Sequence, residues 1–201
     1  VREPERDTLG RVPAFPLHPV EIRRLPRRYW LVVLLGGVFT LARFSEAFLV
    51  LRAQDVGLSL GLVPLVMIVM NVFYAGFAYP AGAAADGVRP RTLLLIGLVL
   101  LVSADLVLAT ATTPLAAFVG AALWGLHMAI TQGLFAKLVA DNAPAELRGT
   151  AFGVFNLVSG GALLLASVIA GALWSVWGAT ATFAVGGIFA AIPVLGLLLY
   201  R

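Results

Sequence analysis

Six long apolar runs constrain this chain more than any other feature of its sequence. Each run is close to the roughly 20 residues that an α-helix needs to cross the hydrocarbon core of a bilayer. The runs cover residues 29–51, 61–85, 92–111, 114–140, 149–172 and 178–199. A backbone inside lipid must satisfy its own polar groups, so runs of this length predict helices. The sequence therefore predicts an all-α membrane protein with six transmembrane helices.

The composition argues against most other classes of protein. Hydrophobic residues make up 61% of the 201 residues and charged residues only 12%, where a soluble domain has roughly a quarter of its residues charged. Half of the basic residues lie before Tyr29, a membrane-flanking pattern rather than a nucleic-acid-binding surface. The chain has no cysteine, no phosphate-binding loop and no hydrolase motif. We therefore expect no nucleic-acid partner, no metal, no cofactor and no enzymatic activity.

Two segments of the chain differ in composition. Residues 1–28 are polar, basic and rich in proline, which predicts a cytoplasmic linker, and residues 29–201 form the transmembrane domain. The chain begins with Val1 and shows no signal-peptide pattern, so we expect it to be a piece of a longer polypeptide. Basic residues concentrate in the N-terminal segment, in the second and fourth connections and at Arg201, whereas the other connections hold only Arg52. This asymmetry predicts a multi-pass protein of the bacterial cytoplasmic membrane with both termini in the cytoplasm.

Three short motifs follow one another along the chain. In chain order they are residues 45–54 in the first run, Gly82 with Asp86, Arg89 and Arg91, and residues 144–153. In this order, and with the six-run spacing, they resemble the major facilitator superfamily over residues 29–201. The resemblance implies the C-terminal half of a major-facilitator-type helical bundle. It also implies an N-terminal six-helix half, in the same or a partner chain, besides the lipid bilayer and a small-molecule substrate.

The resemblance further implies a cytoplasmic gate at the second and fourth connections. The gate residues would be Gly82, Asp86, Arg89, Arg91 and Arg148. A carboxylate at a helix end can pair with cationic side chains in one conformation and release them in another. The alternative is a turn whose arginines only fix the membrane topology. Close to the fourth connection, Lys137 and Asp141 are one helical turn apart and are expected to pair with each other.

Arg43, Glu46 and Asp105 are charged residues inside the apolar runs. Burying each of them costs roughly 2.5–3.5 kcal/mol on insertion scales, so each should face protein or water with a partner. Arg43 and Glu46 share one helix face, and the helical rise places Asp105 at a similar depth, about 20 Å from the cytoplasmic end. We expect at least one cross-helix pair or water-bridged contact among the three. Arg43 and Glu46 are candidates for substrate binding or proton coupling, and Asp105 for a structural or coupling charge; the alternative is a structural ion pair.

Four uncharged polar residues complete the predicted substrate or ion path. Asn71 and Tyr74 share a face of the second predicted helix, and Asn156 lies in the fifth. Such side chains hydrogen bond either to a substrate or to neighbouring helices, and both readings stay open. His127 lies in the middle of the fourth predicted helix, where it could carry a proton or act as a neutral hydrogen-bonding group.

Three functions are consistent with these features. The first is secondary active transport, in which one half of a carrier moves a small molecule by alternating access, with the proton as the expected coupling ion. The second is a non-transporting assembly or regulatory membrane protein that retains the transporter fold. The third is an intramembrane enzyme, which would need catalytic side chains that converge in a closed pocket. The family resemblance and the charges inside the apolar runs favour transport.

Overall fold

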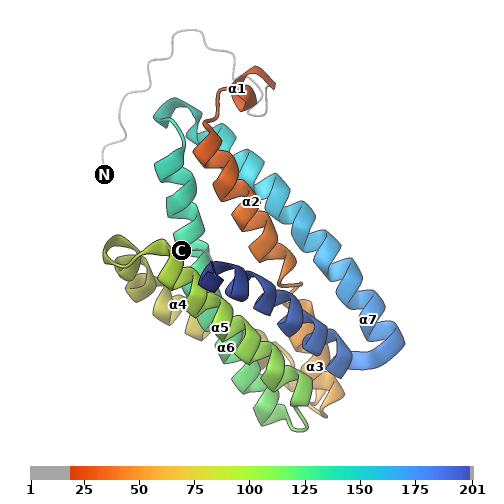
Figure 1. The fold of residues 1–201 in the computed structure, drawn as a ribbon. Helices are drawn as coiled ribbons and strands as arrows, with labels where there is room; N and C mark the ends of the chain where they lie inside the picture. Colours follow the sequence, from red (N-terminus) through yellow and green to blue (C-terminus); the bar gives the residue numbers. More distant parts are fainter. Residues whose placement is uncertain (1–18, 200–201) are drawn as a thin grey trace.

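The computed structural model describes residues 19–199, which fold into helices joined by short turns and contain no β-strand (Figure 1). The α-helices are α1 (Pro19–Arg23), α2 (Arg27–Leu41), α3 (Ala47–Asp55), α4 (Pro64–Gly87), α5 (Pro90–Thr110), α6 (Pro114–Asn142) and α7 (Arg148–Leu199), with single 3₁₀ turns at Leu60–Leu62 and Ala145–Leu147. Most of the predicted linker, residues 1–18, and the C-terminal Arg201 lie outside the described residues. Proline begins α4, α5 and α6, where its missing N–H costs no helical hydrogen bond.

Four helical segments in the described part of the chain are long and apolar enough to cross a membrane. They are Leu60–Gly87, Pro90–Thr110, Pro114–Asn142 and Ala145–Leu195. The second, third and fourth predicted spans correspond to α4, α5 and α6. The first predicted span is divided between α2 and α3, and the last two are joined in α7. The all-helical class is confirmed, whereas six separate spanning helices are not.

The helix expected over residues 29–51 is interrupted at residues 42–46. Side chains in and near this break replace part of the lost helical hydrogen bonding. The backbone N–H of Ser45 donates to Oγ of Ser167 at 3.1 Å, and the N–H of Ala47 donates to Oγ of Ser45 at 3.3 Å. Hydroxyl side chains compete with the backbone in this way. The break is thus stabilised by one hydrogen bond within it and one from the distant Ser167, and it places Arg43 outside regular helix.

Helix α7 is two helices that meet at Gly178, where φ is 80° and ψ is −177°. Residues with a Cβ rarely adopt this backbone conformation, which glycine permits. We call residues 148–177 the first arm and residues 179–199 the second arm of α7; Figure 1 shows the second arm turning back from the end of the first. The connection expected at Trp174 to Trp177 is helical instead, because those residues keep helical torsions and the turn needs one glycine only.

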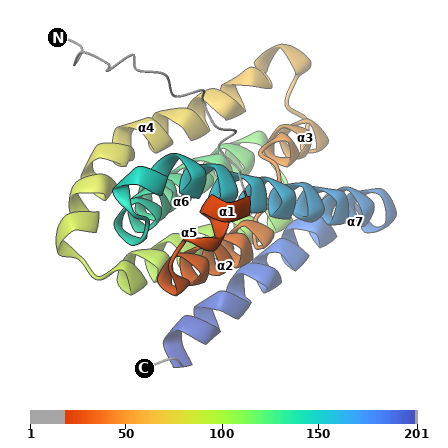
Figure 2. The same cartoon turned by 90° about the horizontal axis from the view of Figure 1, so that it is seen from above.

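The helices pack around α6 and α5. Helix α6 contacts α4 and α5, and α7 contacts both α5 and α2 (Figure 2). Gly125 of α6 lies so close to the carbonyl oxygen of Met70 that a Cβ there would overlap it, and Gly36 is similarly close to the ring of Phe155. Small residues permit such approaches between membrane helices. The largest apolar core cluster includes Trp124, which is fully buried.

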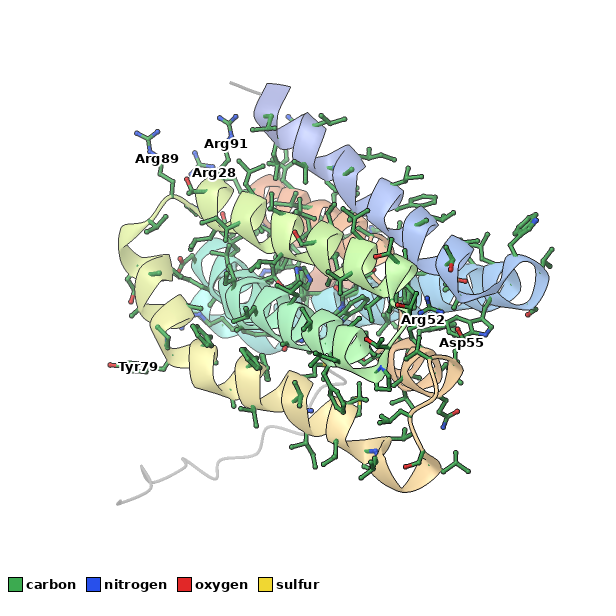
Figure 3. All side chains as sticks on the ribbon, turned by 90° about the horizontal axis from the view of Figure 1, so that it is seen from below. Arg28, Arg52, Asp55, Tyr79, Arg89 and Arg91 are labelled. Atoms are coloured by element: carbon green, nitrogen blue, oxygen red, sulfur yellow. The ribbon has the colours of Figure 1, made fainter. Side chains whose placement is uncertain are left out.

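Charged side chains separate between the two ends of the helical bundle. Figure 3 shows Arg28, Arg89 and Arg91 near one end, and Arg52 with Asp55 near the other. Two hydrogen bonds tie the N-terminal part of the chain to the first arm of α7. The hydroxyl of Tyr29 donates to the carbonyl oxygen of Ala151 at 2.9 Å, and Oγ1 of Thr150 donates to Glu21 at 2.8 Å. The separation of charged side chains between the two ends of the bundle fits the charge asymmetry from which we predict the membrane orientation. That orientation stays a prediction.

Candidate functional site

A cavity of about 290 Å³ lies between α2, α6 and the first arm of α7. Its walls combine polar side chains with phenylalanine rings. The lining residues are Phe39, Thr40, Arg43, His127, Thr131, Gln132, Phe135, Ala136, Phe152, Phe155, Asn156 and Ser159. The fold therefore brings together three of the predicted path residues: Arg43 from the break between α2 and α3, His127 from α6 and Asn156 from α7.

Arg43 enters the cavity from the break between α2 and α3. Its side chain is 16% exposed, and its Nη2 lies 3.8 Å from Oε1 of Glu46, too far for a hydrogen bond. Its Nε is buried without a hydrogen-bond partner among the described residues. Glu46 occupies the N-cap position of α3 without a side-chain capping hydrogen bond, at a helix end whose dipole favours negative charge. Glu46 does not line the cavity, so Arg43 is a cationic donor group that the surrounding protein leaves largely unused.

His127 is buried in α6 and contacts α5 through its ring. Its Nδ1 lies 2.7 Å from the carbonyl oxygen of Gly97. A carbonyl only accepts hydrogen bonds, so Nδ1 must carry a hydrogen, and in the neutral ring Nε2 is left as an acceptor. A Cβ on Gly97 would lie 2.5 Å from Cγ2 of Thr131. The glycine thus lets α6 approach closely enough for His127 to reach the α5 backbone.

Tyr74 holds a cavity residue without lining the cavity itself. Its hydroxyl donates to Oε1 of Gln132 at 3.0 Å. Gln132 was not among the predicted path residues, although an amide within a predicted transmembrane run was the available signal. Asn71, which does not line the cavity, is exposed and donates from Nδ2 to the carbonyl oxygen of Met67, one turn back in its own helix. The predicted pair on α4 therefore separates into a supporting tyrosine and an asparagine bonded within its helix.

Asp105 is fully buried in α5 but lies away from the cavity residues. Neither of its carboxyl oxygens has a hydrogen-bond partner in the described part of the chain. The carboxyl group packs against the second arm of α7, where a Cβ on Gly186 would lie 3.2 Å from Oδ2. No direct contact joins Asp105 to Arg43 or Glu46 among residues 19–199. The only direct pair within the expected group of three is the local one between Arg43 and Glu46.

At the end of the bundle where α4 meets α5, Asp86 forms an ion pair with Lys137 of α6. The same ammonium group donates to the carbonyl oxygen of Ala85 at 2.9 Å. The expectation that Lys137 pairs with Asp141 is therefore wrong. The reason is that the carboxylate and the free carbonyl at the end of α4 together offer Lys137 two acceptors.

The other predicted gate residues make fewer contacts. Arg91 donates from Nη2 to the carbonyl oxygen of Leu198 at 3.3 Å, which ties the start of α5 to the second arm of α7. Arg89 and Arg148 are exposed, and neither makes a side-chain hydrogen bond or ion pair within the described residues. Gly82 has no atom within 4 Å of the position of a Cβ, so packing does not require glycine there.

Arg52, which the sequence suggested only as a topology marker, is a buried structural residue. Its Nε donates to the carbonyl oxygen of Leu108 at 2.8 Å, and its Nη2 donates to those of Ala109 at 3.3 Å and Ala111 at 2.9 Å. Its Nη1 forms an ion pair with Asp55. Arg52 thus satisfies the free carbonyls at the C-terminus of α5. The signal in the sequence for a structural role of Arg52 was Asp55, the acidic residue one helical turn later.

The described residues contain no set of side chains that could bind a metal ion. Across residues 19–199, no group of three or more His, Cys, Asp or Glu side chains is placed to hold a metal ion. The polar cavity residues are instead hydrogen-bond donors and acceptors with one cation among them. This arrangement can bind and orient a small polar molecule by hydrogen bonds and charge.

One protein family and two known proteins are similar to most of this chain. The family described as Major Facilitator Superfamily matches residues 29–201. An uncharacterized MFS-type transporter of Methanocaldococcus jannaschii is 33% identical over 185 residues, which are 89% of this chain and 46% of that protein. The MFS-type transporter ppzB of Metarhizium rileyi is 34% identical over 126 residues, 60% of this chain and 26% of that protein. The chain thus spans less than half the length of both relatives, and its long apolar helices fit a multi-pass integral membrane protein.

Proposed function

The chain belongs to the Major Facilitator Superfamily, and from that premise we propose that it is the C-terminal six-helix half of a secondary active transporter. The transporter moves a small molecule by alternating access across a cytoplasmic membrane, with both termini of this half in the cytoplasm. The N-terminal half is supplied by the same polypeptide or by a partner. The observation that carries the proposal is the cavity at the α2–α3 break, which Arg43 enters.

The interruption of the first span supports this proposal physically. Transporter sites are commonly built where a membrane helix is broken, because the unwound backbone is tolerated only where it faces a cavity or other protein. In this chain the break holds a guanidinium that lines the cavity, and amide, imidazole and hydroxyl groups also line it. We propose that Arg43, His127, Gln132 and Asn156 contact the substrate, and that Tyr74 positions Gln132.

The cytoplasmic gate belongs to the same proposal. The Asp86–Lys137 ion pair and the Arg91 bond to α7 join helices at the end where the basic residues gather. In alternating access, contacts of this kind form in one state and open in the other. We propose that Lys137 is the partner from which Asp86 separates when the cytoplasmic side opens.

The proton is the proposed coupling ion, and Glu46 is the first candidate to carry it. Glu46 lies beside Arg43, so its charge state bears directly on the guanidinium that faces the cavity; His127 and Asp105 are the next candidates. The test is uptake driven by a pH gradient after Glu46→Gln. Loss of coupling with retained downhill transport is expected, and intact pH-driven uptake would remove Glu46 from this role.

Alternating access can be tested without knowing the substrate, because this chain contains no cysteine. The variant Ser159→Cys places a thiol in the cavity, in a complete carrier freed of any other cysteine. A membrane-impermeant maleimide is then applied to right-side-out and to inverted vesicles. Labelling from both sides is expected. Val88→Cys and Ser59→Cys, on exposed turns at opposite ends of the bundle, serve as controls that should react from one side each.

A one-sided result would contradict transport. If Ser159→Cys reacted only from one side while both control variants behaved as expected, the cavity would not alternate. The chain would then fit a non-transporting membrane protein that keeps the transporter fold. Labelling from both sides would count against that alternative, because a cavity that is closed towards one compartment reacts from both sides only if its opening changes.

A further inference from the structure

The charge of the cavity wall is unbalanced. Arg43 is the one charged residue among the lining residues of the described cavity, and the other polar groups are a histidine, two amides and three hydroxyls. Glu46 lies 3.8 Å from Nη2 of the guanidinium and is not among the lining residues. The only charge on the cavity wall is therefore positive, so it repels a bound cation and attracts a bound anion, and Glu46 offsets it from outside the lining.

The guanidinium also has unused hydrogen-bond donors. Arg43 makes no side-chain hydrogen bond to any described residue, and its Nε is buried. Oγ of Ser159, which lines the cavity from the first arm of α7, is likewise buried and unpaired among the described residues. Leaving buried donors unpaired is unfavourable, and donors of charged groups are the most costly to leave so. A carboxylate matches the planar fork of a guanidinium with two parallel hydrogen bonds.

The remaining wall of the cavity is aromatic. Phe39 and Phe135 have ring centroids 5.2 Å apart, and Phe135 and Phe155 have centroids 6.0 Å apart. Phe152 adds a fourth ring to the lining. Rings in such a cluster favour contact with another aromatic or apolar body rather than with a fully hydrated one. The cavity thus offers one anion-binding end and one apolar wall.

We propose that the substrates bound here are monovalent organic anions with an aromatic or apolar body, held by Arg43 through their carboxylate group. This inference rests on the proposed transport function for its meaning, but binding can be measured separately. Glu46 is the ion-pair partner of Arg43 in the empty cavity, and it competes with the carboxylate of a substrate for the guanidinium. Removing the charge of Glu46 should therefore tighten binding of an anion rather than weaken it.

The test compares three probes of nearly equal shape: benzoate, benzyl alcohol and benzylammonium. Binding is measured by equilibrium dialysis with the complete carrier, both halves present, in lipid nanodiscs. Benzoate should bind at least about tenfold more tightly than either other probe, as hydrogen bonds to a charged group imply. Arg43→Gln should remove this preference by weakening benzoate alone, Arg43→Lys should restore part of it, and Glu46→Gln should strengthen benzoate binding.

A matched control and a second readout keep the outcomes separate. Arg28→Gln removes an exposed arginine far from the cavity and should leave benzoate binding unchanged. Benzoate should also protect Ser159→Cys from the maleimide. The inference would be wrong if benzylammonium bound more tightly than benzoate, or if a folded Arg43→Gln variant kept its benzoate affinity. It would also be wrong if benzoate failed to bind at about 10 mM, a concentration that corresponds to a binding free energy near −2.7 kcal/mol. Two-sided labelling without benzoate protection would reject the anion class alone, and one-sided labelling with benzoate binding would reject transport alone.

Discussion

Arg43 and Arg52 lie nine residues apart, Arg43 inside the first predicted transmembrane run and Arg52 directly after its end, and their guanidinium groups have opposite surroundings. Arg52 is 6% exposed, donates to three carbonyl oxygens of the α5 C-terminus and pairs with Asp55. Arg43 faces a cavity, forms no side-chain hydrogen bond with any described residue and has Glu46 at 3.8 Å.

The difference separates a structural charge from one that we propose is held for a ligand. A membrane protein bears the cost of burying a guanidinium either by bonding it internally or by leaving it for another molecule. Arg52 follows the first course, because every group that it contacts belongs to the fold. We propose that Arg43 follows the second, because no described residue completes the hydrogen bonding of its guanidinium.

The strongest test of this comparison is to replace each arginine by glutamine and compare stability. Arg52→Gln should lower the free energy of unfolding by about 2–4 kcal/mol, because it leaves several buried carbonyls without a charged donor. Arg43→Gln should change it by less than about 1 kcal/mol, because it breaks no hydrogen bond. Thermal unfolding in a mild detergent measures both. Equal losses for the two variants would remove the distinction.

Asp105 extends the comparison to a carboxyl group. Like the side chain of Arg43, it has no hydrogen-bond partner in the described chain, and it is fully buried, so Asp105→Asn should keep or raise the free energy of unfolding, by up to about 1 kcal/mol. Asp55→Asn is the matched control, since it weakens the ion pair of Arg52 and should destabilise. Unfolding temperatures of the two variants should move in opposite directions. A clear loss for Asp105→Asn would place Asp105 with Arg52 instead.

Tyr74 tests a hydrogen bond that supports the cavity without lining it. Tyr74→Phe removes the donor to Gln132 and should lower the free energy of unfolding by about 1 kcal/mol. Tyr79→Phe is the control, because Tyr79 is 86% exposed and points away from the bundle (Figure 3). Unfolding curves compare the two. If both variants behaved alike, the Tyr74–Gln132 bond would not help hold α4 against α6.

Lys137 should show the smallest effect on stability and a larger one on access. Its side chain and that of Asp86 are 36% and 78% exposed, and exposed ion pairs contribute about 0–1 kcal/mol. Lys137→Met should therefore hardly move the unfolding temperature, yet speed maleimide labelling of Ser159→Cys from the cytoplasmic side. Lys137→Arg keeps the pair and should label at the parental rate. An unchanged rate for Lys137→Met would count against the proposed gate.

The sequence predicted the helical class and most of the long helices, because lipid leaves the backbone few alternatives. It did not predict the break at residues 42–46, since Ser45 is bonded by Ser167, a residue more than one hundred positions later. It also misplaced the end of the fifth span. The residues around Trp174 are compatible with either a turn or a helix, and only the torsions of Gly178 decide between them.

For the cavity and gate residues, the sequence likewise identified candidates but not their contacts on other helices. Residue type identified Arg43, His127 and Asn156, which the fold does bring to one cavity. Spacing could not say that Lys137 reaches across to Asp86 rather than along its helix to Asp141. Nor could it say that Asp105 faces the second arm of α7. Partners on other helices depend on rotation about each helix axis, and a uniformly apolar helix encodes that rotation weakly.

The single-residue turn at Gly178 makes the second arm of α7 act as a lever. The arm is about 30 Å long at the usual helical rise, so a change of about 5° in its direction would move its far end by about 3 Å. That displacement is enough to break the bond between Arg91 and the carbonyl oxygen of Leu198. Small torsional shifts at one end of the bundle would thereby be magnified into a detectable displacement at the other.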